Sequence, residues 1–221
     1  MKAMILAAGK GTRLAPLTNT TPKPLLPLAG KPLIEWQILA LARAGVDEII
    51  INLHHLGEQI STHLGDGKRY NLNITYSRET QLLETGGGIV NALPLFENQP
   101  FWLLNGDIWT DFDFSTLPQR PSGDNLAHIV LTPTPPSRET GDFQCANGQV
   151  TKRGSDYVYC GIAVLVPELF AGLDVSHFSL RNLYFDLIHK QQLSAQIHLG
   201  QWHDIGTLEE YQALGATLQN I

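Results

Sequence analysis

A glycine-rich turn followed by fixed cations is the part of this sequence best suited to chemistry. The apolar residues 4–8 run directly into Gly-Lys-Gly-Thr-Arg at residues 9–13, and Lys23 follows between two prolines. Glycines let backbone N–H groups approach phosphate oxygens closely, and nearby cations balance the phosphate charge. Because the flanking prolines restrict the backbone, they hold the Lys23 ammonium in place. These residue types in this order indicate a site for a triphosphate.

The glycine turn alone is not specific for a triphosphate. A dinucleotide-binding fingerprint needs a third glycine that opens a helix, and a P-loop needs Gly-Lys-Ser/Thr after four spacer residues; the sequence has neither. A tight bend between a strand and a loop remains as the alternative for the turn, and a solvated loop cation as the alternative for Lys23. Arg13 and Lys23 together with the turn favour phosphate binding. The missing third glycine argues strongly against a nicotinamide-dependent dehydrogenase.

A carboxylate follows the most apolar segment of the first half. Residues 101–104 are continuously apolar and deliver Asn105, Gly106 and Asp107 at their carboxyl end. Mg²⁺ in proteins is often held by one or two carboxylates together with phosphate oxygens, so Asp107 beside a bound triphosphate is a candidate ligand. The alternative is an Asx turn that caps the strand. In the company of the glycine turn we favour the metal, and Mg²⁺ is the expected cofactor.

The first half of the chain alternates strand and helix. Apolar runs predict strands, and periodic apolar patterns predict helices between them. The predicted strands are residues 2–7, 48–53, 73–77 and 101–104, and the predicted helices are residues 32–43, 57–64 and 85–93. This order predicts a parallel sheet covered by helices. Ligands of such sheets collect at the carboxyl ends of the strands, where the glycine turn and Asp107 are expected to meet.

The second half has a different pattern. It reads as strands, a hairpin that turns at Asn147-Gly148, and two helices, the last of them capped by Thr207. The predicted strands are residues 126–132, 157–166 and 195–199, the hairpin covers residues 141–150, and the helices are residues 180–191 and 208–218. This half is mixed α+β, which suits a part that holds a second substrate against the first.

Composition limits the classes of protein that fit. The 221 residues are 43% hydrophobic, enough for one large domain with a full core. No apolar run approaches the ~18 residues of a membrane span and no basic leader precedes an apolar stretch, so we expect a cytoplasmic protein without a membrane partner. Cys145 and Cys160 lie outside any metal-binding spacing and are expected to be buried thiols. A net charge of −6 argues against nucleic acid as the main partner.

The first segment resembles a known family. Leu-Ala-Ala-Gly-x-Gly-Thr-Arg-Leu-x-Pro-Leu-Thr at residues 6–18 and Pro-Lys-Pro at residues 22–24 match the signature of the sugar-1-phosphate nucleotidylyltransferases at nearly every position. The resemblance implies an α/β fold, with a Rossmann-like, mostly parallel mixed sheet flanked by helices and a smaller α+β sugar-binding part. It also implies a nucleoside triphosphate, a sugar 1-phosphate and Mg²⁺. By this resemblance the residues that hold the triphosphate are Gly9, Gly11, Thr12, Arg13 and, at the α-phosphate, Lys23.

Later segments extend the resemblance. Trp-His-Asp-Ile-Gly-Thr at residues 202–207 resembles the family's W-x-D-x-G-T segment, which implies that Asp204 binds substrate and is the second Mg²⁺ ligand. The alternative is that Asp204 caps the final helix. Leu-Glu-Thr-Gly-Gly-Gly at residues 83–88 is placed like the base-binding loop, with a glycine-rich helix entry as its alternative. The residues implied around the nucleotide are Glu79 as the polar reader of the base, Glu84, Thr85, Gly86 and Asn105, and those implied at the sugar are Gly141 and Gly161.

The chain also departs from the family pattern. Many members carry Glu-Lys-Pro where residues 150–154 here read Val-Thr-Lys-Arg-Gly, so it stays open whether Lys152 or Arg153 replaces that lysine. No hexapeptide-repeat tail follows, and we expect no β-helix. The short length, the segment at residues 83–88 and Gly-Asp-Phe at residues 141–143 most resemble the N-acetylmuramate 1-phosphate uridylyltransferases of bacterial cell-wall recycling.

A reaction follows from these expectations. A sugar phosphate is already an anion, so its oxygen needs no general base to attack the α-phosphorus of UTP, the expected nucleotide. Arg13, Lys23 and Asp107 are the expected catalytic residues. We expect one domain over residues 1–221, whose nucleotide half is 1–110 and whose sugar half is 111–221.

The sequence does not fix which base and which sugar the protein selects. Mannose-1-phosphate guanylyltransferase, glucose-1-phosphate thymidylyltransferase and phosphocholine cytidylyltransferase are therefore alternatives. A non-catalytic nucleotide-sugar-binding module is a further alternative, although such a binder has no need for both carboxylates. The chain is expected to act as a monomer or small homo-oligomer.

Overall fold

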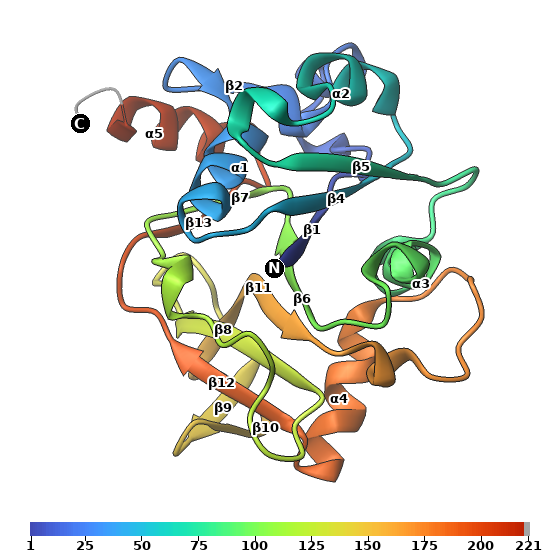
Figure 1. The fold of residues 1–221 in the computed structure, drawn as a ribbon. Helices are drawn as coiled ribbons and strands as arrows, with labels where there is room; N and C mark the ends of the chain where they lie inside the picture. The colour runs from blue at the N-terminus through green and yellow to red at the C-terminus, as the bar shows by residue number, and fades with distance from the viewer. Residues whose placement is uncertain (219–221) are drawn as a thin grey trace.

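A mixed sheet of nine strands runs through the protein (Figure 1). The computed structural model describes residues 1–218. The strands of this sheet are β1 (Lys2–Leu6), β4 (Glu48–Leu53), β5 (Asn73–Arg78), β6 (Phe101–Asn105), β8 (Ala127–Pro133), β9 (Phe143–Ala146), β10 (Gln149–Arg153), β11 (Tyr157–Leu165) and β12 (Leu193–Ile197). Their order across the sheet is β5-β4-β1-β6-β11-β8-β12-β10-β9. The helices are α1 (Leu33–Arg43), α2 (Gly57–Leu64), α3 (Glu84–Ala92), α4 (Leu180–Lys190) and α5 (Leu208–Leu218).

The parallel part of the sheet aligns the ends of the first strands. β5, β4, β1 and β6 lie side by side and run parallel, with Leu6 opposite both Asn52 and Asn105. Strands buried on both faces need continuous apolar residues, which the sequence supplies. The polar residues that follow each apolar run therefore gather at one edge, as expected from the sequence.

The second part of the sheet is mostly antiparallel. β11 is antiparallel to both β6 and β8, while β12 runs parallel to β8. β9 and β10 form the predicted hairpin, whose turn residues Asn147 and Gly148 have φ values of 53° and 75°. Two positive φ angles in a two-residue turn match the right-handed twist of the strands, which explains the Asn-Gly sequence. The sheet is mixed and flanked by helices, as the sequence predicts.

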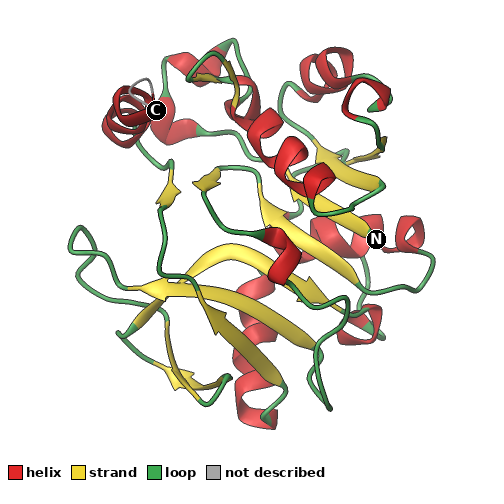
Figure 2. Ribbon diagram, turned by 60° about the vertical axis from the view of Figure 1, so that its left-hand side comes forward, coloured by secondary structure: helices red, strands yellow, loops and turns green. Residues whose placement is uncertain are grey.

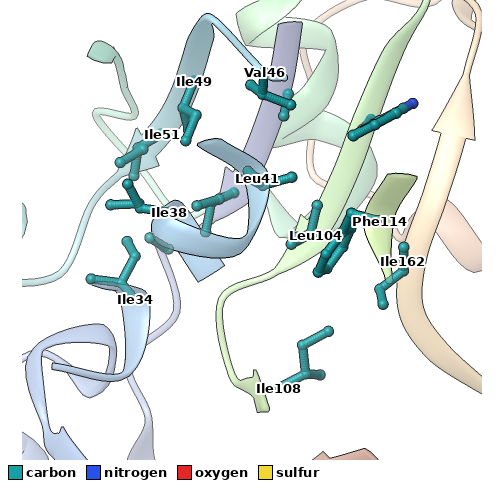
Figure 3. Close-up of a cluster of buried hydrophobic side chains, with 14 of the residues drawn as sticks. Ile34, Ile38, Leu41, Val46, Ile49, Ile51, Leu104, Ile108, Phe114 and Ile162 are labelled. Atoms are coloured by element: carbon teal, nitrogen blue, oxygen red, sulfur yellow. The ribbon is translucent and has the colours of Figure 1, made fainter. Parts of the chain in front are cut away.

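Helices cover both faces of the sheet, and Figure 2 shows the strands as one twisted layer between them. On one face Ile34, Ile38 and Leu41 of α1 pack against Ile49 and Ile51 of β4, all of them fully buried (Figure 3). The helical residues repeat at the spacing that places them on one side of α1. Burying each such side chain contributes about 1.5–3 kcal/mol, so this face anchors the strands that carry the site.

The opposite face belongs to α3 and α4. Met4 and Ile50 alternate with the residues that face α1 and instead pack in a cluster with Ile89 of α3 and Leu187 of α4. Successive strand residues point to opposite faces, so the two clusters sit on either side of one layer. The two helices thereby bring the entry of α3 and the start of α4 close to the carboxyl edge of the parallel strands.

Two small ribbons were not predicted from the sequence. β2 (Pro27–Leu28) pairs with β3 (Lys31–Pro32), and β7 (Ile108–Thr110) pairs with β13 (Trp202–Asp204). They are two or three residues long, too short for a periodic pattern to show. The β7–β13 ribbon joins segments about a hundred residues apart and positions the second candidate carboxylate.

The end of the chain returns to its beginning. Ile205, Leu214 and Leu218 pack in one buried cluster with Leu14 and Leu28. The sequence halves at residues 1–110 and 111–221 are therefore not separate in space. The predicted bounds of α5 and its Thr207 cap are confirmed, because the Thr207 hydroxyl accepts a hydrogen bond from Glu210 N at 3.2 Å.

One predicted strand is displaced. The sequence places it at residues 195–199, whereas β12 spans Leu193–Ile197. Leu199 is 81% exposed, so its apolar side chain misled the assignment. Within residues 1–218, no helix is both long and apolar enough to cross a bilayer.

Candidate active site

The glycine turn forms a cradle of unused backbone donors. β1 ends at Leu6, and the Ala7 N–H donates to the Asn52 side-chain oxygen at 2.7 Å. Within residues 1–218 the N–H groups of residues 8–11 have no hydrogen-bond acceptor. Gly11 has a φ of 62°, and a Cβ there would lie 3.0 Å from Thr18 and 3.2 Å from Lys23. The turn therefore requires glycine and leaves its donors free for an anion.

A cavity of about 320 Å³, here called the first cavity, opens beside this turn. Its walls come from the turn, the segment after Lys23, the entry of α3 and the end of β6. Of the residues predicted from the sequence, those that line it are Gly9, Gly11, Thr12, Arg13, Lys23, Glu84, Thr85, Asn105 and Asp107. Residues from four separate segments thus meet at the carboxyl edge of the parallel strands, where ligands of such sheets bind.

Lys23 is held inside this cavity by an ion pair. Its side chain is 9% exposed, and Nζ donates to Asp107 Oδ2 at 2.9 Å. A buried cation needs such a partner because its own hydration is lost. The pair fixes the ammonium beside the glycine turn, as the proline-flanked sequence predicts.

Asp204 reaches the same place through the β7–β13 ribbon. Ile205 N donates to the Asp107 carbonyl oxygen at 2.9 Å, and Asp204 is paired with Ile108 across the ribbon. Burial raises the pKa of the Asp204 carboxyl above its ordinary value, and the negative charge of Asp107 raises this pKa further. The two carboxylates are therefore close enough to repel each other. The β7–β13 ribbon thus brings together the two carboxylates that the resemblance implies as Mg²⁺ ligands.

The two carboxylates fit a divalent cation. Their mutual repulsion is what a cation between them would relieve. Within residues 1–218, no group of three or more His, Cys, Asp or Glu side chains is placed to hold a metal. Asp107 and Asp204 would therefore leave most ligand positions to phosphate oxygens and water, which is the usual way proteins bind Mg²⁺.

Arg138 already neutralises one of these carboxylates. Its Nη2 donates to Asp204 Oδ2 at 3.0 Å, and its Nη1 lies 4.0 Å from Asp142 Oδ2. Arg138 belongs to the proline-rich segment between β8 and β9. Nothing in the sequence marks it, because its partner lies 66 residues further along the chain.

Arg13 also lines the first cavity. It is exposed, and within the part of the chain that the structure describes it has no ion-pair partner. A Cβ placed on Gly206 would come within 2.7 Å of Arg13 Nη1, so the guanidinium rests against the backbone that follows Asp204. Glu210 fixes that backbone, since its carboxylate accepts from Gly206 N and Thr207 N at 2.8 Å each.

The entry of α3 corrects one prediction. Gly86 does not line the first cavity: its N–H donates to Phe178 O at 2.9 Å, and a Cβ there would meet the Phe178 ring at 2.3 Å. A Cβ on Gly87 would likewise meet Ser176 O at 1.8 Å. These glycines allow the segment before α4 to approach the helix, rather than a base. Glu84, with a φ of 62°, and Thr85 form the cavity wall instead.

Glu79 is also displaced from its predicted role. It is 7% exposed, its Oε1 accepts from Asn52 Nδ2 at 2.7 Å, and its Oε2 accepts from Leu83 N at 3.1 Å. Both oxygens are engaged within the protein, and Glu79 does not line the first cavity. Asn52 in turn holds Ala7 N. The carboxylate therefore links the glycine turn to the entry of α3 through contacts that already use both of its oxygens.

A second cavity of about 800 Å³ adjoins the first. Thr85 and Asn105 line both cavities and form their boundary. Gly141, which the resemblance implies at the sugar, lines the second cavity. The aromatic residues Phe143, Tyr159, Tyr184 and Phe185 contribute much of its wall. Its position next to the first cavity provides room for a second substrate.

Gly161 lies behind the wall rather than in either cavity. It is buried with a φ of 74°, and a Cβ there would come within 2.8 Å of the Asn105 side chain. The pairing of β11 with β8 shifts register between Tyr159 and Ala163, so the strand bulges at this point. Gly161, predicted to contact the sugar, thus makes room for Asn105, which lines both cavities.

The structure also separates the two candidates for the missing lysine. Arg153 lines the second cavity, whereas Lys152 does not and lines a different surface hollow. Adjacent residues at the end of β10 point to opposite sides, as strand geometry requires. The geometry therefore favours Arg153. Arg181, at the first turn of α4, lines the second cavity too and was not predicted.

The fold and the site together identify the class of protein. Residues 2–153 match the model of the nucleotidyl transferase family, and the chain belongs to this family. The glycine turn and Lys23 lie in the matched part, together with Asp107 and Arg153.

Similar proteins narrow the comparison. N-acetylmuramate alpha-1-phosphate uridylyltransferase of Neisseria meningitidis serogroup B is 44% identical, over 97% of this chain and 98% of that protein. Mannose-1-phosphate guanylyltransferase catalytic subunit beta of Drosophila melanogaster is 30% identical over 95% of this chain, which spans 60% of that longer protein. Among solved structures, a candidate glucose-1-phosphate thymidylyltransferase of Bacillus anthracis in complex with sucrose superposes with a TM-score of 0.87 at 21% identity, over 100% of this chain and 96% of that one. At 21% identity, the similarity to this solved structure supports the fold alone.

Proposed function

We propose that this enzyme transfers a uridylyl group from UTP to N-acetylmuramate 1-phosphate. The products are UDP-N-acetylmuramate and pyrophosphate. The observation that carries the proposal is that Lys23 and Asp107, from distant segments, line one cavity close to Asp204, and that this cavity adjoins a second. The Neisseria relative, similar over almost its whole length, supports this base and this sugar.

The proposed reaction depends on positioning and charge. An oxygen of the sugar phosphate attacks the α-phosphorus, and the bond from that phosphorus to the pyrophosphate oxygen breaks. The N–H groups of the glycine turn and Arg13 bind the triphosphate and stabilise the departing pyrophosphate. Lys23 stabilises the charge on the α-phosphoryl oxygens. The substrate supplies its own nucleophilic oxyanion, so no side chain needs to remove a proton.

Asp107 and Asp204 would hold Mg²⁺ in this proposal. The bound ion would offset the repulsion between the two phosphate groups. Lys23, which Asp107 holds at 2.9 Å beside the glycine turn, would contact the α-phosphoryl oxygens. Arg138, which donates to Asp204 at 3.0 Å, would neutralise that carboxylate in the free protein.

In this proposal each cavity binds one of the two substrates. Glu84, Thr85 and Asn105 surround the nucleotide at the first cavity, and Gly141 contacts the sugar at the second. Residues 1–110 supply most of the nucleotide site and residues 111–221 most of the sugar site, within one domain over residues 1–221. We place the enzyme in the cytoplasm, as a monomer or small homo-oligomer, where UTP and sugar phosphates are available.

A substrate matrix tests the proposal. The purified protein is incubated with Mg²⁺ and each pairing of UTP, GTP, dTTP or CTP with the 1-phosphates of N-acetylmuramate, N-acetylglucosamine, mannose and glucose. Pyrophosphate release should be fastest with UTP and N-acetylmuramate 1-phosphate. Fastest release with GTP and mannose 1-phosphate would instead favour the activity named for the Drosophila relative. Binding of nucleotide sugars without pyrophosphate release from any pair would indicate a non-catalytic module.

A further inference from the structure

The second cavity presents two guanidinium groups that no carboxylate in the described part of the protein neutralises. Arg153 and Arg181 both line it. Within residues 1–218, neither guanidinium group forms an ion pair or a hydrogen bond with another group of the protein. Most other arginines of the protein have an acidic or carbonyl partner, Arg69, Arg78 and Arg120 among them. Two unpaired cations in a cavity next to the reacting groups are unusual enough to indicate an anionic ligand.

Arg181 is positioned by α4. Arg181, Tyr184 and Phe185 all line the cavity and are spaced three and four residues apart, so they share one face of the helix. Leu180 N donates to Thr85 Oγ1 at 2.9 Å, which fixes the first turn of α4 against the boundary between the two cavities. Arg181 therefore lies beside the place where the two substrates meet.

Arg153 is positioned by an aromatic ring. Its guanidinium carbon lies 4.5 Å from the centre of the Phe185 ring, a distance at which the cation is attracted to the ring face. This stacking holds Arg153 about one helical turn along α4 from Arg181 while leaving its N–H donors free. The two arginines thus come from different elements and are both held at the same wall.

The carboxylate that lines this cavity already has partners within the protein. Asp142 is the carboxylate among the lining residues that the structure describes. Its Oδ2 accepts a hydrogen bond from Tyr159 N at 3.0 Å and lies 4.0 Å from Arg138 Nη1. Asp142 is thus bound to the backbone of β11 and faces a third arginine. The cavity as a whole keeps an excess of positive charge.

We propose that Arg153 and Arg181 bind a carboxylate on the sugar and select an acidic sugar phosphate over a neutral one. The inference rests on the proposed function and deepens it, because N-acetylmuramate differs from N-acetylglucosamine by a lactyl ether that ends in a carboxylate. A guanidinium presents parallel N–H donors that match both oxygens of a carboxylate. A neutral sugar offers the two cations no such partner, so it binds with lower affinity.

The test compares two ligands that differ only in this group. UDP-N-acetylmuramate and UDP-N-acetylglucosamine are titrated calorimetrically into the wild-type protein and into Arg153→Gln, Arg181→Gln and Lys152→Gln. Lys152→Gln is the matched control, since it removes one positive charge one residue from Arg153 but outside the cavity. Each arginine variant should weaken UDP-N-acetylmuramate by about tenfold or more and leave UDP-N-acetylglucosamine within about twofold, because charge-assisted hydrogen bonds are lost only with the acidic ligand. The control should change neither.

Other outcomes overturn the inference. An equal loss for both ligands would show that the arginines contact a shared group such as the phosphates. Equal affinity of the wild-type protein for both ligands would show that the cavity does not select for a carboxylate. Pyrophosphate release distinguishes this failure from failure of the proposed function. If the wild-type protein binds UDP-N-acetylmuramate selectively but releases no pyrophosphate with N-acetylmuramate 1-phosphate, the carboxylate site stands and the proposed transferase activity does not.

Discussion

The two cavities handle charge in opposite ways. At the first, the two candidate metal ligands already hold cations, with Lys23 on Asp107 at 2.9 Å and Arg138 on the neighbouring Asp204 at 3.0 Å. In the second, Arg153 and Arg181 face an aromatic wall, and within residues 1–218 they have no acidic partner. The second cavity is also the larger of the two, at about 800 Å³ against about 320 Å³.

This difference separates chemistry from selection. Groups that act on every substrate benefit from being held in place before the substrate arrives, and internal ion pairs do this. Groups that select one substrate need the opposite, an unsatisfied charge that only the correct partner neutralises. We therefore infer that Lys23 and the two carboxylates, which are paired in the free protein, serve the reaction, and that the unpaired Arg153 and Arg181 serve selection. Arg13 is unpaired as well, because its proposed partner is the triphosphate.

Removing the paired cation should produce the largest effect. We expect Lys23→Met to lower kcat by about 100- to 1,000-fold, because an ammonium aimed at the α-phosphoryl oxygens is lost. Pyrophosphate release under saturating substrates measures this, and circular dichroism confirms the fold. Lys190→Met is the control, since Lys190 is exposed at the end of α4 and lines neither cavity. Turnover near wild type in Lys23→Met would exclude Lys23 from the mechanism.

The carboxylate of the same pair is expected to matter through the metal. Asp107→Asn should raise the Mg²⁺ concentration for half-maximal activity by about tenfold or more, because a charged ligand becomes neutral. A Mg²⁺ titration of activity measures the change. Asp113→Asn is the control, since Asp113 is an exposed cap whose carboxylate binds Ser115. An unchanged titration in Asp107→Asn would remove this residue from the proposed metal site.

The sequence predicts the residues of the first cavity better than those of the second. The parallel strands, the glycine turn, Lys23 and Asp107 lie in segments with strong local patterns, and the structure brings them together as expected. Arg138 and Arg181 carry no local pattern. Arg138 reaches Asp204 from the loop between β8 and β9, and Arg181 faces the second cavity because of the way α4 packs. Tertiary packing decides both positions.

Glu79 and Gly86 show a second limit of sequence reasoning. Both lie in a segment that the sequence places near the first cavity. The Glu79 carboxylate nevertheless bonds inside the protein, and Gly86 packs against the Phe178 ring. A motif identifies the segment but not which side chains face the ligand, because three consecutive glycines serve helix packing as well as they serve a base. In the structure, a Cβ at Gly86 or Gly87 would collide with Phe178 or Ser176, so these glycines are needed for packing against the segment before α4.

The buried carboxylate beneath the first cavity should affect stability and leave base preference unchanged. Glu79→Gln replaces one acceptor with a donor facing Asn52 Nδ2 or Leu83 N, so we expect a loss of about 1–3 kcal/mol in the free energy of unfolding. Urea denaturation measures this loss, with the exposed Glu58→Gln as control. The relative rates with UTP and CTP should stay the same. A changed base preference at unchanged stability would restore Glu79 as a direct reader of the base.

The smallest expected effect is at the contact between the two regions. Arg138 extends from the segment before β9 to Asp204, so in the free protein it competes with any cation for that carboxylate. Arg138→Gln should tighten Mn²⁺ binding by about two- to fivefold, the range of a partly exposed ion pair. Electron paramagnetic resonance of free Mn²⁺ measures this without turnover, and Arg120→Gln, whose partner Glu168 lies on the surface, is the control. Weaker Mn²⁺ binding would mean that Arg138 positions Asp204 for the metal instead of opposing it, and the first cavity would then depend on the second half of the chain for its assembly.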